Sequence, residues 1–396
     1  MKTRNLILFA FFITISAYVF IQFVKPTDLP AASMSAIGSE TIRARVIEVI
    51  DDGETDLGGT PQRYQVARVE LQEGEYKDLI MEMDYGRRQV ISSGLYLKPG
   101  DDILVTIGSR LDGVLTVYFV DFVRIRPLMW LLASFFVAII FISGWKGFRA
   151  LLSMIFSLAM IIGIIIPRIL TGDDPLLVSI FGSMILLGVT LYLTYGWNLK
   201  THSAVMSMVL VLLITGTLSG LFVLLTKLTG SGDENSLFLV QMLGTQINTR
   251  GLLLGGLIIG ALGVLDDLVT TQASAVFELR HANLSLGFRG LYQAAMRIGQ
   301  DHVAATVNTL VLAYVGASLP MLLMFSLGRG NLSYLVNFEV VAEEIVRTLV
   351  GSLGLISAVP ITTAIAILMA LRADSLQKWE HVLGPEGGGG VDGHSH

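Results

Sequence analysis

The chain is 396 residues long, is 53% hydrophobic before its 41 glycines are counted, and has only 15% charged residues. Soluble globular domains are usually about 25% charged, so this composition excludes that class and indicates a membrane protein. The lack of cysteine excludes disulfides, thiol catalysis and thiolate metal sites. With 27 basic and 32 acidic residues, the net charge of −5 gives no reason to expect nucleic acid as a partner.

A helix that spans a bilayer needs about 20 mostly apolar residues. The first such run is Leu6–Val24, which follows Lys2 and Arg4. We expect residues 1–27 to form an uncleaved signal anchor that crosses the membrane. The alternative is a cleaved signal peptide, because small residues at 31–33 offer a cutting site.

Residues 35–126 have the alternating pattern of strands. The strand-like stretches are RARVIEVI, RYQVARVELQ, DLIMEMDY, DILVTIG and LTVYFVDFV, and the turn signals between them are DDG, GGTP, KPGDD and LDG. Five short strands predict a small closed barrel, of the OB type. Because these residues offer no convergent catalytic set, we expect a structural cap on the membrane domain. The alternative is a platform for a ligand or partner.

Seven further apolar runs predict a seven-span transmembrane domain over residues 128–372. They are Leu128–Ser143, Leu151–Pro167, Leu176–Tyr195, Ser203–Leu225, Gly251–Phe277, Val303–Leu327 and Val346–Leu371. With the anchor, the chain is predicted to be a polytopic α-helical membrane protein of about eight spans, one plus seven. Leu237–Ile247 is too short to cross and predicts an interfacial or re-entrant segment. Residues 373–396 are glycine-rich and predict a flexible cytoplasmic tail.

Loop charges orient these spans, because basic residues gather on the cytoplasmic side. With the N-terminus inside, the inner loops hold Lys2, Arg4, Lys146, Arg149, Lys200, Arg280, Arg289, Arg297, Arg372 and Lys378. The outer loops then hold fewer, namely Arg168, Lys227, Arg250, Arg329 and Arg347. This bias predicts that both termini are cytoplasmic and that residues 28–126 are extracytoplasmic.

Two adjacent acids in the span Gly251–Phe277 are the strongest functional signal. Ionisable residues inside spans are costly and usually face a bundle interior or a water-filled cavity. Asp266 shares a helix face with Thr270, and Asp267 shares one with Thr271. The two acids point about 100° apart, so we do not expect them to serve one site equally. We predict that they couple to a proton or another cation; alternatively, they mark the cytoplasmic end of a shorter helix.

The same span offers two further features. Gln272 follows the threonines and joins the predicted ion pathway. The first half of the span carries glycines on one face, and such a face lets another helix approach within the chain or from a second copy. A homo-oligomer is therefore compatible with the sequence.

The segment HANLSLGFRGLYQAAMRIGQDH is amphipathic and basic, so we expect it to lie at the inner membrane surface. It leads into Val303–Leu327, where Asp301 and Asn308 share a face and Thr309 follows. We predict that Asn308 reaches the depth of Asp266, and that Pro320 kinks this span near its outer end. His302 is a candidate because histidine is the side chain that normally titrates near neutral pH. It is a weaker candidate, since a histidine at this place in a sequence is more often a surface residue than a functional one.

The last span starts with Glu343 and Arg347, which are spaced to form an i, i+4 pair. Further along, Gly351, Gly354 and Pro360 predict a broken helix that exposes backbone carbonyls beside Thr362 and Thr363. Interrupted helices of this kind often build substrate sites in transporters.

Three segments together resemble a known family. They are LDDLVTTQASAVFEL, IGQDHVAATVNTLVLAYVGASLP, and EEIVRTLVGSLGL with the later AVPITT. They are similar to the bacterial YibE/F family of multi-pass membrane proteins, most specifically at Asp301, Asn308, Thr309, Leu310, Leu312, Ala313, Tyr314 and Gly316. The resemblance implies a bacterial cytoplasmic (inner) membrane and a fold, but no activity. A looser similarity, to SecD and the proton-driven resistance-nodulation-division exporters, implies coupling through intramembrane carboxylates.

These patterns favour a secondary transporter for a small ion or solute, with the lipid bilayer as its surroundings. The absence of G-x-x-x-x-G-K-[ST] excludes ATP hydrolysis by a P-loop, and no motif predicts a cofactor or a metal. H-E-x-x-H and G-x-S-x-G are also absent, so we do not expect an enzyme. The alternative is a non-transporting partner, assembly factor or sensor whose outer domain binds another envelope component.

Overall fold

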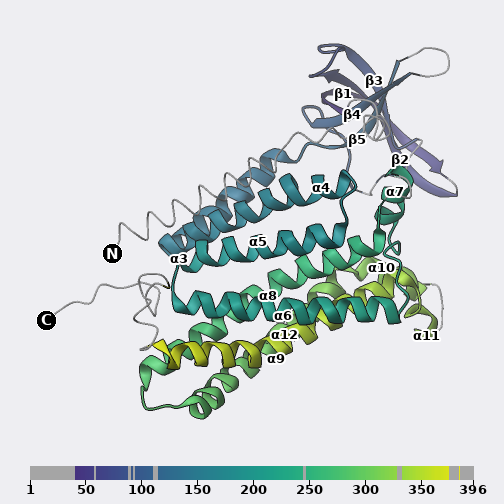
Figure 1. The fold of residues 1–396 in the computed structure, drawn as a ribbon. Helices are drawn as coiled ribbons and strands as arrows, with labels where there is room; N and C mark the ends of the chain where they lie inside the picture. The colour runs from purple at the N-terminus through teal and green to yellow at the C-terminus, as the bar shows by residue number, and fades with distance from the viewer. Residues whose placement is uncertain are drawn as a thin grey trace. The chain divides into compact units, whose positions relative to one another are not determined.

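The computed structural model describes residues 41–57, 59–87, 91, 94–109, 115–243, 247–327, 332–373 and 383. The predicted signal anchor lies outside these residues, as does the predicted tail except for Ala373 and Leu383. The described chain divides into two compact units, and it passes from one to the other between Phe141 and Ile142. The first unit contains a β-barrel and the second a bundle of long helices (Figure 1).

The predicted five-stranded barrel is confirmed. Its strands are β1 (Thr41–Leu57), β2 (Thr60–Leu71), β3 (Ile80–Tyr85), β4 (Asp102–Ser109) and β5 (Leu115–Phe122). They close in the order β1-β2-β3-β5-β4, and the β3–β5 pair is parallel while the others are antiparallel. One expected turn is wrong, because β1 continues through the DDG segment, where Gly53 pairs with Tyr64 of β2.

Alternating residues fill the barrel interior, as the strand period requires. Along the start of β1, Ile42, Ala44 and Val46 are buried while their neighbours are exposed. The buried amide of Gln65 accepts a hydrogen bond of 2.7 Å from the Leu97 N–H, which holds the segment before β4 against the barrel. That segment ends in the predicted turn at residues 98–101, whose glycine has a φ of +93°.

The second unit is built from long helices. The helical elements are α3 (Ile125–Met160), the π-helical turn η1 (Ile161–Ile165), α4 (Ile166–Leu170), α5 (Pro175–Tyr195), α6 (Leu199–Leu225), α7 (Glu234–Leu243), α8 (Thr249–Ala282), α9 (Phe288–Ala317), α10 (Leu319–Leu327), α11 (Leu332–Leu335) and α12 (Glu339–Leu371). Within the described residues, five helical stretches are long and apolar enough to cross a membrane, or six if the bent pair α9–α10 counts as one.

One of these stretches contains two of the predicted spans. Leu128–Ser143 and Leu151–Pro167 lie on either side of a kink at Gly144 within Ile125–Leu170. A straight helix of this length would measure about 69 Å, more than twice the about 30 Å core of a bilayer. The stretch is interrupted at Gly144, whose φ of +54° and ψ of −134° are not helical. Glycine adopts this conformation readily, so Gly144 alone separates the two helical segments that we expected a loop to separate.

Helix α9 corrects a second expectation. The amphipathic residues from Phe288 on do not form a separate surface helix, because they are continuous with the following span in one helix. Gly299 does not break α9, since it lies against Val359 of α12 and allows the two helices to approach. The expected kink near Pro320 is confirmed, as α9 and α10 meet at a bend of 60°.

The prediction of a broken last span is wrong. Helix α12 is continuous through Gly351, Gly354 and Pro360. The glycines serve packing instead: a Cβ added at Gly354 would overlap the Thr215 side chain of α6. Because proline removes only one backbone donor and its neighbours pack closely, the helix continues past Pro360.

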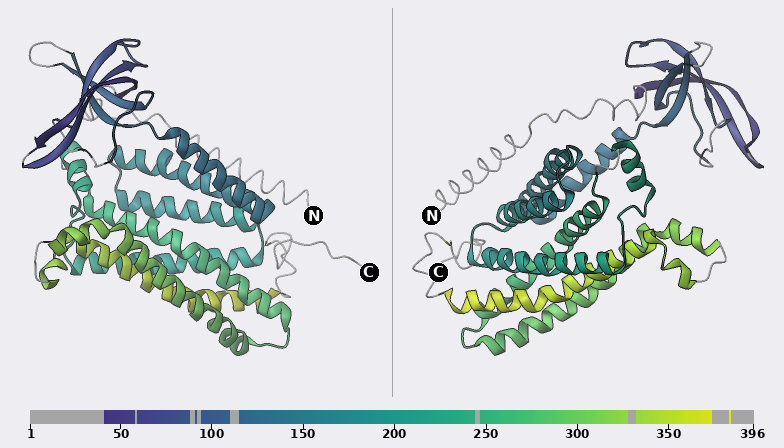
Figure 2. Two further views of the ribbon diagram at one scale, coloured as in Figure 1. Left: turned by 180° about the vertical axis from the view of Figure 1, so that it is seen from behind. Right: turned by 45° about the vertical axis from the view of Figure 1, so that its right-hand side comes forward.

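Helix α12 lies at the centre of the bundle. It packs against α6, α8 and α9, which run alongside it in both views of Figure 2. The core between these helices contains fully buried large side chains, among them Leu265, Phe277, Leu291, Leu355 and Ile367. Leu383 also packs against this core, and its carbonyl lies 2.9 Å from the His202 Nε2 atom of α6.

This packing predicts that Gly354→Ala destabilises the helical unit. The added methyl group must displace Thr215, and overpacking of this kind costs about 1–3 kcal/mol. The matched control is Gly220→Ala in α6, where an added Cβ meets no atom within 4 Å. Thermal unfolding in detergent should show a lower midpoint for Gly354→Ala only; equal midpoints would contradict the assigned contact.

Candidate functional site

The two acids of α8 lie in different surroundings. The Asp267 side chain is 78% exposed, and its Oδ2 atom lies 3.9 Å from the Nε2 atom of His302 on α9. Asp266 is half-buried, and its Oδ1 atom is buried without a hydrogen-bond partner. Helix α8 continues to Ala282, so the acids do not mark the end of a shorter helix.

The neighbouring threonines follow the same division. The Thr270 hydroxyl lies 3.2 Å from the Tyr195 hydroxyl of α5 and donates to the Asp266 carbonyl at 2.9 Å. Thr271 is exposed, and its hydroxyl lies 3.4 Å from the Asp267 carboxylate. The face of α8 with Asp266 and Thr270 therefore contacts α5, whereas Asp267 and Thr271 lie on the face toward α9.

Gln272 links three helices. Its Nε2 atom donates to the Ala295 carbonyl of α9 at 2.9 Å and to the Thr363 hydroxyl of α12 at 2.7 Å. The side chain is buried, and Gly299 lies directly against it. These contacts give Gln272 a packing role, in place of the predicted place in an ion pathway.

The predicted residues of α9 do not converge on Asp266. Asp301, Asn308 and Thr309 are exposed, and Thr309 donates to its own helix at the Ala305 carbonyl. The helix turns Leu310 inward instead, and Asn308 lies on its exposed side. His302, the weaker candidate from the sequence, is the α9 side chain that contacts an acid.

The last two predicted residues lie in α12. Thr362 is fully buried, and its hydroxyl oxygen has no hydrogen-bond partner. Pro360 is half-buried within the continuous helix. Neither residue lies at a break in the helix, because α12 is continuous through both.

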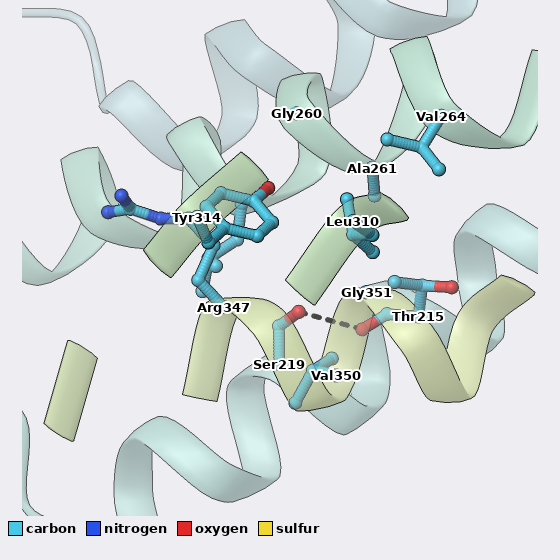
Figure 3. Close-up of a pocket in the computed structure, with 11 residues that line it drawn as sticks. Thr215, Ser219, Gly260, Ala261, Val264, Leu310, Tyr314, Arg347, Val350 and Gly351 are labelled. Carbon is cyan, nitrogen blue, oxygen red and sulfur yellow. Dashed lines mark hydrogen bonds between the residues drawn. The ribbon is translucent and has the colours of Figure 1, made fainter. Parts of the chain in front are cut away.

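A small cavity, with a mostly apolar lining and a few polar side chains, lies between four helices of the bundle (Figure 3). It is lined by Thr215 and Ser219 of α6, Leu257, Gly260, Ala261 and Val264 of α8, Leu310 and Tyr314 of α9, and Arg347, Val350 and Gly351 of α12. The space open to the centre of a water molecule is about 10 Å³, which is room for about one water. Neither aspartate lines it, although we expected one of them to do so.

The hydroxyl groups of the cavity present acceptor oxygens. Thr215 donates to the Val211 carbonyl at 2.8 Å. Ser219 donates to the Thr215 carbonyl, also at 2.8 Å (Figure 3). Their lone pairs stay available to a water molecule. Sequence reasoning missed this site, although the four-residue spacing of Thr215 and Ser219 places their hydroxyls on one helix face.

Arg347 provides the only positive charge among the residues that line this cavity. Its NH1 atom lies 2.5 Å from the Oε1 atom of Glu344. The sequence predicted a pair with Glu343 instead, at the i, i+4 spacing. The i, i+3 spacing prevails here, which leaves Glu343 without this partner.

The long apolar helices and the low content of charged residues define an α-helical membrane protein. Residues 131–372 match the family described as YibE/F-like protein, and because this match covers more than half of the chain, the chain belongs to that family. No curated protein and no solved structure matches the chain.

The three-helix contact of Gln272 yields a stability prediction. Gln272→Leu keeps the volume but removes the two interhelical hydrogen bonds to the Ala295 carbonyl and the Thr363 hydroxyl, each worth about 0.5–1.5 kcal/mol. The control is Thr271→Val at the adjacent exposed position. Thermal unfolding in detergent should show a clearly lower midpoint for Gln272→Leu. An unchanged midpoint would argue against a stabilising role for the hydrogen bonds of Gln272 to α9 and α12.

Proposed function

We propose that the chain is a secondary transporter, coupled to a proton or another cation, with Asp266 and Asp267 in the coupling site. The observation that carries the proposal is the Asp267–His302 pair, which lies about one helix turn from a water-sized cavity inside the bundle. A carboxylate and an imidazole can each bind and release a proton, so the pair offers two proton-accepting groups side by side.

Helix geometry connects the pair to the cavity. Leu257, Gly260 and Val264 of α8 line the cavity and lie on one face of the helix. Asp267 continues that face three residues further on, a rise of about 4.5 Å. An acid this close to a water-sized space gives a proton a short path into the bundle.

The size of the cavity limits what passes in this conformation. Room for about one water suits a proton, and a larger ion or a small solute requires the helices to move apart. The cargo is therefore a small ion or solute of a class still to be assigned, and the proton is the proposed coupling ion.

The same proposal includes the membrane arrangement. A 46-residue stretch interrupted at Gly144 supports two spans, which join α5, α6, α8, α9–α10, α12 and the predicted anchor to give eight. Both termini are then cytoplasmic in the inner membrane, and the barrel is extracytoplasmic. Its strand order, with a parallel β3–β5 pair, supports an OB-like fold.

A second function is favoured by one observation, the small volume of the cavity beside an exposed Asp267. On this alternative the chain is a non-transporting partner or sensor, and its barrel binds another component of the cell envelope. Flux measurements separate the two, because a partner protein does not dissipate a pH gradient.

We expect Asp267→Asn to abolish proton flux through the protein, and Asp266→Asn to reduce it. The amide cannot carry a proton between its two states, whereas the carboxylate can. The measurement uses the full chain in vesicles with an internal pH dye, an imposed pH gradient, and a series of monovalent and divalent cations. Glu278→Gln, an exposed acid of the same helix, is the control. If the wild-type chain and both variants give the same flux with every cation, transport through this site is excluded.

A second prediction tests the cavity itself. Gly260 lines the cavity, and a Cβ added there meets no atom within 4 Å, so we expect Gly260→Leu to narrow the cavity and slow the flux while folding is retained. Gly256→Leu, one turn away, is equally free of contacts but does not line the cavity. Equal flux in the two variants would remove the cavity from the path.

A further inference from the structure

Glu343 is a buried acid whose charge is only partly satisfied. The residue is 6% exposed, and its Oε1 atom is buried without a hydrogen-bond partner. The backbone N–H of Gly232 donates a hydrogen bond to the carboxylate. A buried carboxylate oxygen without a donor is costly, unless a proton or another cation neutralises it.

The charged groups around Glu343 are mostly acidic. On α12, Glu339 precedes it by one turn, and the side chain of Arg347 is held by Glu344. Asp233 is the acid that faces Glu343 from the preceding loop. Glu343 is therefore surrounded by two acids and by one arginine that is already paired. The site lacks one positive charge, which a bound proton or another cation would supply.

Glu343 is not needed to hold the adjacent loop. The Glu339 carboxylate already accepts the Thr229 hydroxyl at 2.7 Å and the Gly230 N–H at 3.0 Å, as well as the Thr229 N–H. These bonds fix the loop onto the first turn of α12. A structural role therefore explains Glu339 more fully than it explains the buried, half-satisfied Glu343.

The position of Glu343 relates it to the cavity. Arg347 and Gly351 line the cavity, and Glu343 lies on the same face of α12, one turn before Arg347, a rise of about 6 Å. Asp267 lies about one turn beyond the cavity on α8. The cavity is thus placed between two carboxylates, one on each side along the helices.

We propose that Glu343 is a proton-binding site, the second carboxylate of the path that begins at Asp267. This inference rests on the proposed function and extends it to the other end of the bundle. A proton from water adds to the free Oε1 atom, which changes the side chain from a carboxylate to a neutral carboxylic acid. Its release to a water molecule in the cavity restores the carboxylate, and no oxidation or reduction is involved.

The test is infrared difference spectroscopy of the full chain in lipid nanodiscs, followed as the pH is changed. We expect a carboxylic acid band at neutral pH that shifts in heavy water and disappears in Glu343→Gln. The band should persist in Glu278→Gln, which removes an exposed acid of α8, and in Asp267→Asn. A band that is the same in Glu343→Gln and in the wild-type chain would overturn the proposal.

Two further measurements sharpen the outcome. Proton flux should fall by about tenfold or more in Glu343→Gln and recover in part in Glu343→Asp, which restores an ionisable group. Loss of the band on adding sodium at constant pH would identify a metal cation as the ligand and overturn proton binding. If Asp267→Asn leaves the flux unchanged while the Glu343 band behaves as expected, the transport proposal fails and the proton site stands.

Discussion

The close approach of α12 to its three neighbours is the interaction on which the helical unit depends. Small residues make it possible: Gly354 meets Thr215 of α6, and Gly299 of α9 meets Val359 of α12. Because apolar side chains gain little by leaving lipid for a bundle, such contacts and interhelical hydrogen bonds supply the association energy in a membrane. Gln272 adds those bonds where α8, α9 and α12 converge.

This packing also decides where polar groups can lie. Thr215 and Ser219 bond to carbonyls of their own helix, so the tight seam leaves their oxygens facing a space for one water. Asp267 and Glu343 lie just outside that space. Asp267 lies within α8, and Glu343 lies near the start of α12. The proposed proton path follows from this placement, since each polar group is within about one turn of the cavity.

The sequence predicted those parts of the molecule whose signals are local. Strand alternation located the five strands, and Pro320 located the bend after α9. The divergence of Asp266 and Asp267 follows from the turn of a helix alone. The DDG turn failed because pairing between Gly53 and Tyr64 continues the strand through it.

Other parts depend on contacts between distant segments, and these were not predictable. Gly354 and Pro360 resemble helix breakers, but α12 is continuous through both residues. Thr215 of α6 fills the space that a side chain at Gly354 would take. Glu343 and Arg347 have suitable spacing, yet Glu344 competes for the same guanidinium group. The cavity combines single residues from four helices, and no one segment reveals it.

The hydroxyl groups of α6 have a mechanical consequence. Ser207, Thr215 and Ser219 each donate within their own helix, whereas Gln272 joins α8 and α9 to α12 by hydrogen bonds. The seam between α6 and α12 therefore depends on the fit of side chains, such as that of Thr215 against Gly354, and this interlocked contact opposes sliding of one helix along the other.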